Sequence, residues 1–287
     1  MKVVSLYKVE KSEVGTILAG LSEEVVSSEQ NKFKRCGDYD SRRLGFSPNI
    51  DGLFVTEQGA YTQFTITEQF KVPEPLAVQD LLDLKIFAYK EANEGNKPNN
   101  KELKELKLEV VETLLPSTYP KPTKSYKVII LNDGTIMVEA TGKKAEELLG
   151  KIRMVVGSLP VKFLESETPI GDLLDKLIST QKDDKFELLN KATLIDQDGQ
   201  QASLSKDSLY DSIAQDLIKE GAYATSVELF FDGAVAFDLK DDFTLKGIKF
   251  SDVVEAEDDE QATEFLQISE LIKVVNYILD STKLKEK

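Results

Sequence analysis

The chain contains no histidine and only one cysteine, Cys36. Without histidine, the usual zinc ligand sets are unavailable, and so are the Ser-His-Asp and Cys-His catalytic groups. A single cysteine excludes an internal disulfide, which suits a reducing compartment. Lys34 and Arg35 precede Cys36 and could lower the pKa of its thiol. Because no neighbouring base or second thiol accompanies it, we expect Cys36 to be structural.

Long apolar segments are also missing. No run approaches the roughly 18 to 20 apolar residues that span a bilayer. Residues 1–13 meet charged side chains too early for the apolar region of a secretion signal. We therefore expect a cytoplasmic protein without a membrane partner. The 41% hydrophobic and 30% charged residues are ordinary for a soluble globular protein.

Motifs that would indicate a cofactor are absent as well. There is no glycine-rich phosphate loop. The segment "DQDG", residues 196–199, lacks the later ligands of a calcium loop and is expected to be a turn. The acidic run "EAEDDE", residues 255–260, could collect a magnesium ion, but a solvated loop explains it better. We expect no cofactor, no metal site and no enzyme activity.

Positive charge is scarce overall but concentrated in the middle of the chain. The 287 residues include 36 basic and 51 acidic ones, a net charge of −15. Residues 85–162 nevertheless hold 14 basic and 10 acidic residues, a net of +4, which leaves −19 for the remainder. Residues 251–272 hold eight acids and no base. Such separation predicts one face for a polyanion and other faces that repel it.

The apolar patterns predict an α+β fold in which antiparallel hairpins alternate with packed helices and one helical pair forms a projecting finger. Hairpin turns are expected at residues 58–59, 133–134 and 232–233, with further strands at 3–9 and 245–250. Helices are expected at residues 11–28, 76–93, 99–115, 143–157 and 263–281. The expected domain division is 1–75 for the N-terminal part of a central body, 76–121 for the helical finger, 122–185 for the continuation of the body, and 186–287 for a C-terminal base.

Two patterns in the basic middle favour nucleic-acid contact. Lys97, Lys101 and Lys104 would share one helix face if the helix begins that early, although a solvated face paired with nearby glutamates is the simpler interpretation. In "PSTYPKPTK", residues 116–124, two Xaa-Pro steps stiffen an extended arm that carries Tyr119 beside lysines. An aromatic ring beside fixed cations suits phosphate contact combined with sugar or base stacking. The alternative is a loop tyrosine that packs on its own chain.

Several segments of the chain resemble the recombination-associated RdgC family. The strongest are "LKLEVVETLLPSTY", residues 106–119, and "GTIMVEATGKKAEELLGKIRMVVGSLPV", residues 134–161. Shorter segments match in the same order: "FKRCG" and "LGFSP" near the N-terminus, and "FELLNKATLIDQDG" and "LKGIKFSD" in the C-terminal half. The resemblance therefore covers nearly the whole chain.

That resemblance implies a non-catalytic protein that dimerises into a ring with a basic hole around duplex DNA. It also implies little sequence preference and restraint of a RecA-type recombinase. The implied partners are double-stranded DNA, a second copy of the chain and possible contact with that recombinase, in the bacterial nucleoid or in an infected cell if the gene is phage-borne. The chain departs from the family pattern at Ser117, where arginine is usual, and at Phe46, where tryptophan is usual.

The family's aromatic finger residue corresponds to Tyr119, and its lysine-rich helix and Lys-Lys pair correspond to residues 101–107 and 143–144. Together with the other basic side chains of the middle segment, the expected DNA-binding residues are Lys97, Lys101, Lys104, Lys107, Tyr119, Lys121, Lys124, Lys127, Lys143, Lys144, Lys151 and Arg153. A phosphate near residues 143–144 would also be favoured by the dipole of the helix that begins there.

Two other functions stay open on the sequence. The acidic remainder of the chain could mimic DNA and inhibit a recombinase or a nuclease by direct contact. A metal-dependent exonuclease is a third possibility, because some descriptions attach that activity to the family. No carboxylate cluster with a suitable spacing supports it.

Overall fold

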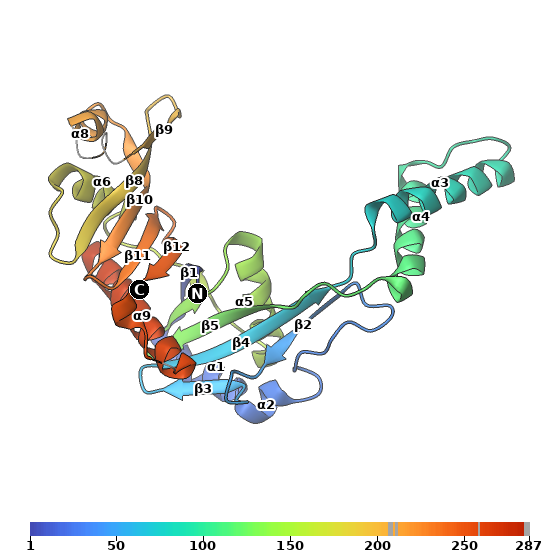
Figure 1. Ribbon diagram of the computed structural model, residues 1–287, viewed down its shortest axis with the longest axis horizontal. Coiled ribbons are helices and arrows are strands. Elements are labelled where there is room, and N and C mark those ends of the chain that lie inside the picture. Colours follow the sequence, from blue (N-terminus) through green and yellow to red (C-terminus); the bar gives the residue numbers. More distant parts are fainter. Residues whose placement is uncertain (206–208, 210–211, 258, 284–287) are drawn as a thin grey trace. The chain divides into compact units, whose positions relative to one another are not determined.

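A computed structural model describes residues 1–205, 209, 212–257 and 259–283 (Figure 1). The described residues form a mixed α/β fold with eight α-helices and antiparallel strand pairing, as the sequence predicts. Contacts divide the chain into unit 1, residues 1–20, 57–63 and 127–287, and unit 2, residues 21–56 and 64–126. The four domain ranges given above remain a prediction.

Unit 1 is built on one long sheet. Its strands follow the order β5-β6-β1-β12-β11-β10-β8-β9, and β7 pairs with β1. The strands are β1 (Val3–Lys8), β5 (Lys124–Leu131, continuing from unit 2), β6 (Thr135–Val138), β7 (Lys162–Phe163), β8 (Phe186–Ile195), β9 (Gln201–Leu204), β10 (Tyr223–Phe231), β11 (Val235–Lys240) and β12 (Thr244–Phe250). The helices are α1 (Lys11–Gly20), α5 (Gly142–Val156), α6 (Ile170–Thr180), α8 (Ser212–Lys219) and α9 (Glu260–Thr282), with a short 3-10 helix, η2 (Asp252–Val254).

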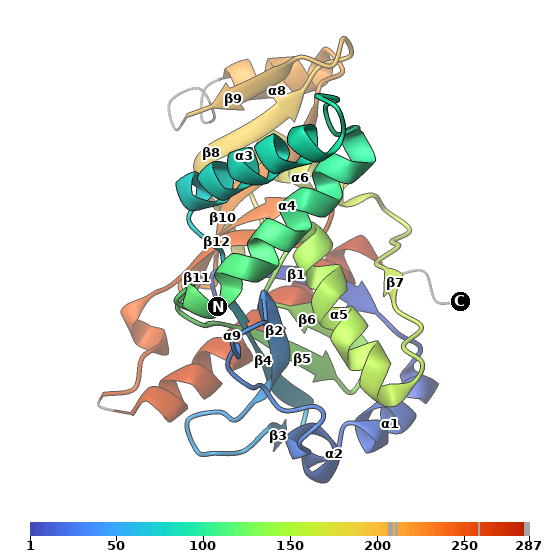
Figure 2. The same ribbon diagram turned by 90° about the vertical axis from the view of Figure 1, so that its right-hand side faces the viewer.

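The core of unit 1 lies between this sheet and its helices. Helix α5 buries Ala145, Leu148, Leu149 and Ile152, as its apolar periodicity predicts, while Val155 is only partly buried. Figure 2 shows α5 lying across β1, β5 and β6. Helices α6 and α9 bury a continuous set of leucine, isoleucine and valine side chains in one cluster with β8, β10, β11 and β12. Each such side chain stabilises the fold by about 1.5–3 kcal/mol.

Unit 2 contains α2 (Glu23–Ser27), β2 (Arg42–Ser47), α3 (Pro75–Ala92), α4 (Asn100–Leu114) and the 3-10 helix η1 (Leu115–Ser117). It also holds most of β4 (Tyr61–Phe70) and the start of β3 (Val55–Gln58), two strands that continue into unit 1. Strand β2 pairs with β4. Phe46 is fully buried and meets Phe64 edge to face at 6.3 Å. The phenylalanine ring therefore fills a core position.

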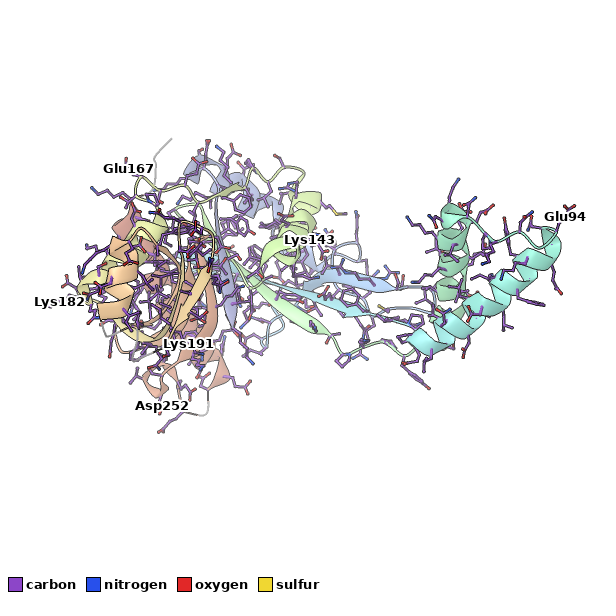
Figure 3. The ribbon with its side chains drawn as sticks, turned by 90° about the horizontal axis from the view of Figure 1, so that it is seen from above. Glu94, Lys143, Glu167, Lys182, Lys191 and Asp252 are labelled. Atoms are coloured by element: carbon purple, nitrogen blue, oxygen red, sulfur yellow. The ribbon has the colours of Figure 1, made fainter. Side chains whose placement is uncertain are left out.

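Helices α3 and α4 pack against each other as the predicted helical pair, and Figure 1 shows α3 running across the view and α4 running down it. The N-terminus of α4 is fixed by a capping box: the Asn99 side chain accepts the backbone N–H groups of Lys101 and Glu102, and the Glu102 carboxylate accepts the N–H of Asn99. Leu82 on α3 and Val110 on α4 are the buried residues of the two helices. The polar loop between the helices contains Glu94, which Figure 3 labels at the far end of the pair.

Three further sequence predictions can be compared with the structure. The helix expected at 11–28 is divided into α1 and α2, because the chain turns between Leu21 and Ser22. Residues 196–199 form the expected turn, in which the Asp196 side chain accepts the N–H groups of Asp198 and Gln200. Within the acidic run 255–260, Asp258 lies outside the described residues, and Asp259 caps α9 by accepting the N–H of Ala262. No helix in the described part of the chain is both long and apolar enough to cross a membrane.

Candidate nucleic-acid interface

Lysine and glutamate side chains occupy different faces of α4. Lys101, Lys104 and Lys107 recur every three residues along one side of the helix, and all three are exposed. Another side carries the acids, and the apolar side faces α3. The acidic residues are Glu102, Glu105, Glu109 and Glu112, and the apolar ones are Leu103, Leu106, Val110 and Leu114. This segregation gives a single helix both a cationic and an anionic face.

Helix α3 contacts the glutamate face of α4. The Lys85 ammonium lies 2.6 Å from a Glu109 oxygen. The pKa of Glu102 lies below its ordinary value because its carboxylate accepts hydrogen bonds from the Asn99 N–H and the Tyr89 hydroxyl. On the lysine face, Lys101 comes only within 3.9 Å of Glu105, and both side chains are exposed, so this contact contributes little. Among the described residues, Lys104 and Lys107 form no ion pair.

The helical pair is not basic as a whole. Residues 75–114 hold six basic and eight acidic side chains. Any attraction for a polyanion must therefore come from the separation of charges on α4 and not from the net charge of the pair. Lys97 is not part of the lysine face, because α4 begins at Asn100 and Lys97 lies in the preceding loop. The expectation that Lys97, Lys101 and Lys104 share a helix face is thus wrong for Lys97.

The segment that follows α4, residues 115–124, presents the most exposed aromatic ring among the large apolar and aromatic residues that the structure describes. Tyr119 is 91% exposed, so it does not pack on its own chain. The segment is anchored on both sides of the ring: Leu115 is buried, and the Lys121 N–H donates to the Phe70 carbonyl over 2.8 Å. Lys121 and Lys124 are exposed, and neither forms an ion pair within the described chain. We call residues 115–124 the arm.

The basic residues of α5 are less available than those of unit 2. Lys143, labelled in Figure 3, is exposed in the first turn of the helix and forms no ion pair with any residue that the structure describes. The Lys144 ammonium lies 2.8 Å from Glu147. Burial lowers the pKa of Lys151, and the Arg153 guanidinium donates to the Leu159 carbonyl over 3.3 Å. Only Lys143 in this group combines exposure with the absence of such a partner.

Lys127 has a strong internal partner. Its ammonium lies 2.7 Å from a carboxylate oxygen of Glu264 on α9, and the Gln63 side-chain amide donates to the same carboxylate over 2.6 Å. Burial would raise the pKa of Glu264, but the hydrogen bonds from Lys127 and Gln63 outweigh it and hold that pKa below its ordinary value. Both side chains of the salt bridge are mostly buried, at 26% and 30% exposure. In the structure Lys127 therefore ties β5 to α9.

The twelve expected DNA-binding residues fall into two groups. Seven belong to unit 2 and five to unit 1. The unit 2 group provides an exposed cationic face on α4 and an exposed aromatic ring flanked by exposed lysines. These are the groups that bind phosphate oxygens and stack on sugars or bases.

One loop of unit 2, residues 33–41, lies outside the predicted set of binding residues. Its sequence indicated only a thiol with basic neighbours, Cys36, and a resemblance to the family over residues 33–37. Burial raises the pKa of the Cys36 thiol, which donates to the Gln69 carbonyl, so Lys34 and Arg35 do not lower that pKa. The same loop, however, exposes Arg35 and Tyr39. The signal that could have identified it is the run of basic residues on both sides of an aromatic residue.

Acidic side chains gather around a cavity in unit 1. This cavity of about 510 Å³ is lined by Glu165, Asp172, Asp175 and Asp241, together with Tyr223 and Phe243. Burial and the neighbouring Asp172 raise the pKa of Asp175. Such a lining repels polyanions. Nowhere in the described residues do three Asp, Glu or Cys side chains come together as ligands for a metal ion.

Comparison with known proteins agrees with the resemblance. Residues 1–271 match the family described as "Putative exonuclease, RdgC". The Recombination-associated protein RdgC of Shewanella loihica is 29% identical over 272 residues, which cover 88% of this chain and 89% of the relative. The proteins of the same name from Salmonella paratyphi B and Salmonella typhimurium are each 31% identical over 229 residues, or 77% of this chain and 75% of theirs. The chain belongs to the RdgC family.

Proposed function

We propose that this protein binds double-stranded DNA without sequence preference and without catalysis, and that it thereby modulates homologous recombination. The observation that carries the proposal is the exposed cationic surface of unit 2. Lys104 and Lys107 on α4 and Lys121 and Lys124 on the arm form no ion pair within the described residues, and Tyr119 is almost fully exposed. The relatives' name, Recombination-associated protein RdgC, supports the link to recombination.

The resemblance carries the proposal further, to a ring-shaped dimer that surrounds DNA and restrains a RecA-type recombinase at the nucleoid. A two-fold pair of identical chains closes without leaving free interfaces. Helix α3 supports association because Leu84 and Phe87 are one turn apart and are 65% and 62% exposed. Measurement of the solution mass, with Leu84→Glu as the variant expected to dissociate the pair, tests this part separately.

A charge-matched pair of variants tests DNA binding. Lys101, Lys104, Lys121 and Lys124 are replaced together by glutamine, and the control replaces four exposed lysines of unit 1, Lys11, Lys176, Lys182 and Lys191. Both variants lose four positive charges, so they change the long-range field of the protein by the same amount. We expect the first to weaken binding to all duplex sequences alike and the control to have a smaller effect. Equal effects would show that the proposed surface is wrong.

A specific observation also favours a second function, inhibition of a recombinase or nuclease by direct contact. Residues 251–272 carry eight acids and no base, and within them Val253 and Phe265 are 77% and 44% exposed. Exposed apolar groups among acids suit a basic protein partner. Capture of a purified recombinase in the absence of DNA would favour this function over DNA binding.

The family description also names an exonuclease. Magnesium-dependent degradation of end-labelled duplex by the purified chain would establish that activity. We expect the label to stay intact while the duplex is bound.

A further inference from the structure

We propose that the loop of residues 33–41 in unit 2 is a second DNA-contacting element, in which Arg35 binds a backbone phosphate and Tyr39 packs on the adjoining sugar or base. The inference rests on the proposed DNA binding and extends it to residues outside the basic middle of the sequence. Three observations support it: the loop is joined to the arm, hydrogen bonds fix its conformation, and Arg35 and Tyr39 are exposed on it.

The Gln69 side chain joins the loop to the arm. Its amide oxygen accepts the N–H of Cys36 over 3.0 Å, and its amide nitrogen donates to the carbonyl of Lys121 over 3.1 Å. Gln69 is buried, with 6% exposure, so both hydrogen bonds are sheltered from water. The Gln69 side-chain amide therefore hydrogen-bonds to the backbone just before Tyr39 and to the backbone just after Tyr119. The loop lies beside the segment already proposed to contact DNA.

The loop is also held in one conformation. The buried Lys71 ammonium donates to the carbonyls of Gly37 and Asp38, over 3.2 and 3.0 Å. The Asp40 carboxylate accepts the N–H of Gly37 over 2.8 Å and the Arg43 guanidinium over 2.7 Å. These bonds lower the pKa of Asp40, the Arg43 bond most strongly. A contact surface that is fixed before binding loses less conformational entropy when the ligand arrives.

Most cations near the loop already have partners. Glu29 pairs with both Lys32 and Lys34, Arg42 pairs with the buried Glu68, and Arg43 pairs with Asp40. Arg35 is different: it is exposed, and it forms no ion pair with any residue that the structure describes. Tyr39, four residues further on, is 78% exposed.

Because the neighbouring cations already have acidic partners, the Arg35 guanidinium and the Tyr39 ring are the groups that this rigid loop offers to a ligand. A guanidinium presents a planar set of donors that can bind two phosphate oxygens at once. Lys121 and Tyr119 offer the same combination of cation and ring on the adjoining arm. The chemistry of both segments therefore suits a polyanion that carries regularly spaced phosphates and stackable sugars or bases.

The test measures binding of the full chain to a plain duplex as a function of salt. The variants are Arg35→Gln, Arg35→Lys, Lys121→Gln and, as the charge-matched control in unit 1, Lys182→Gln (Figure 3). Loss of one phosphate contact makes the slope of log K against log salt shallower by about 0.9, which is roughly an eightfold loss of affinity at 0.1 M salt. We expect this change for Arg35→Gln and Lys121→Gln. Arg35→Lys should keep most of the slope, and Lys182→Gln should leave it unchanged.

Tyr39 is tested on duplex with a single-stranded end, where unpaired bases are free to stack. Tyr39→Ala should weaken binding at least about fivefold, and Tyr39→Phe should retain it. Thermal unfolding checks that the variants fold, which the exposure of both side chains predicts. An unchanged slope for Arg35→Gln, while Lys121→Gln reduces it, overturns the inference and leaves the proposed function standing. If the unaltered chain binds no duplex at all, both fail.

Discussion

The salt bridge between Lys127 and Glu264 allows a quantitative prediction, because the bridge lies within unit 1 and its geometry is simple. Glu264→Gln keeps the size of the side chain and its ability to accept a hydrogen bond from Gln63, but it removes the charge opposite Lys127. Exposed pairs contribute 0.2–1 kcal/mol, and removing one partner of a buried pair costs about 3–5 kcal/mol. With both side chains about one quarter to one third exposed, we expect a loss of about 1–2 kcal/mol in the free energy of unfolding.

Urea denaturation in a double-mutant cycle measures this contribution. The cycle compares Glu264→Gln, Lys127→Met and the double variant, so that effects of each change alone cancel. We expect a coupling energy of about 1 kcal/mol. A coupling energy near zero would refute the view that Lys127 ties β5 to α9.

The same pair predicts a dependence on pH. The pKa of Glu264 is lowered by folding, so its stabilisation is fully present above the unfolded value of 4.5 and is lost as the pH falls through the lower folded value. The stability difference between the unaltered chain and Glu264→Gln should therefore be constant near neutral pH and shrink in acid. Glu264→Gln also leaves Lys127 charged without its partner. If Lys127 contacts DNA as the sequence predicts, this variant should bind duplex more tightly.

Two further predictions concern unit 2 and the packing around glycine. Tyr126→Phe should lower the free energy of unfolding by about 1.5–3 kcal/mol, because the Tyr126 hydroxyl donates over 2.7 Å to the buried carboxylate of Glu68. Urea denaturation measures this loss. A change below about 0.5 kcal/mol would contradict the prediction. Gly45→Ala should destabilise by about 1–3 kcal/mol, because a β-carbon there would lie 2.5 Å from the Phe33 nitrogen. Its control, Gly150→Ala inside α5, meets no atom within 4 Å and should be neutral or stabilising by up to about 1 kcal/mol.

The sequence predicted the regular elements best where the apolar period was long and the turns were distinctive. The hairpin at Asp232-Gly233 is an example: both residues have positive φ, 47° and 71°, as a tight two-residue turn requires, and the Asp-Gly pair indicates this turn. The helices of the α3–α4 pair end within one residue of their predicted limits because a proline, an asparagine cap and a glycine-containing loop mark them. Helix α6 and strands β8 and β9 were not predicted, although the residues that α6 buries, Ile170, Leu173, Leu174, Leu177 and Ile178, follow a helical apolar period.

The candidate site was only partly predictable. Sequence spacing indicated that lysines recur along α4, but it did not show that α3 contacts the opposite, glutamate face. Nor could it show that Lys127 and Lys144 have internal partners, because Glu264 is distant in sequence and the Glu147 contact depends on side-chain conformation. The loop 33–41 was missed for a similar reason. Its position beside the arm depends on Gln69, a residue with no sequence signal of its own.

The most direct test of the account is the affinity of the unaltered chain for a plain duplex of arbitrary sequence, measured in magnesium-free buffer at increasing salt. Five or six neutralised phosphates predict a slope of log K against log salt near −5, with no dependence on base sequence. An affinity that does not change with salt, or the absence of binding at 50 mM salt, would contradict the account.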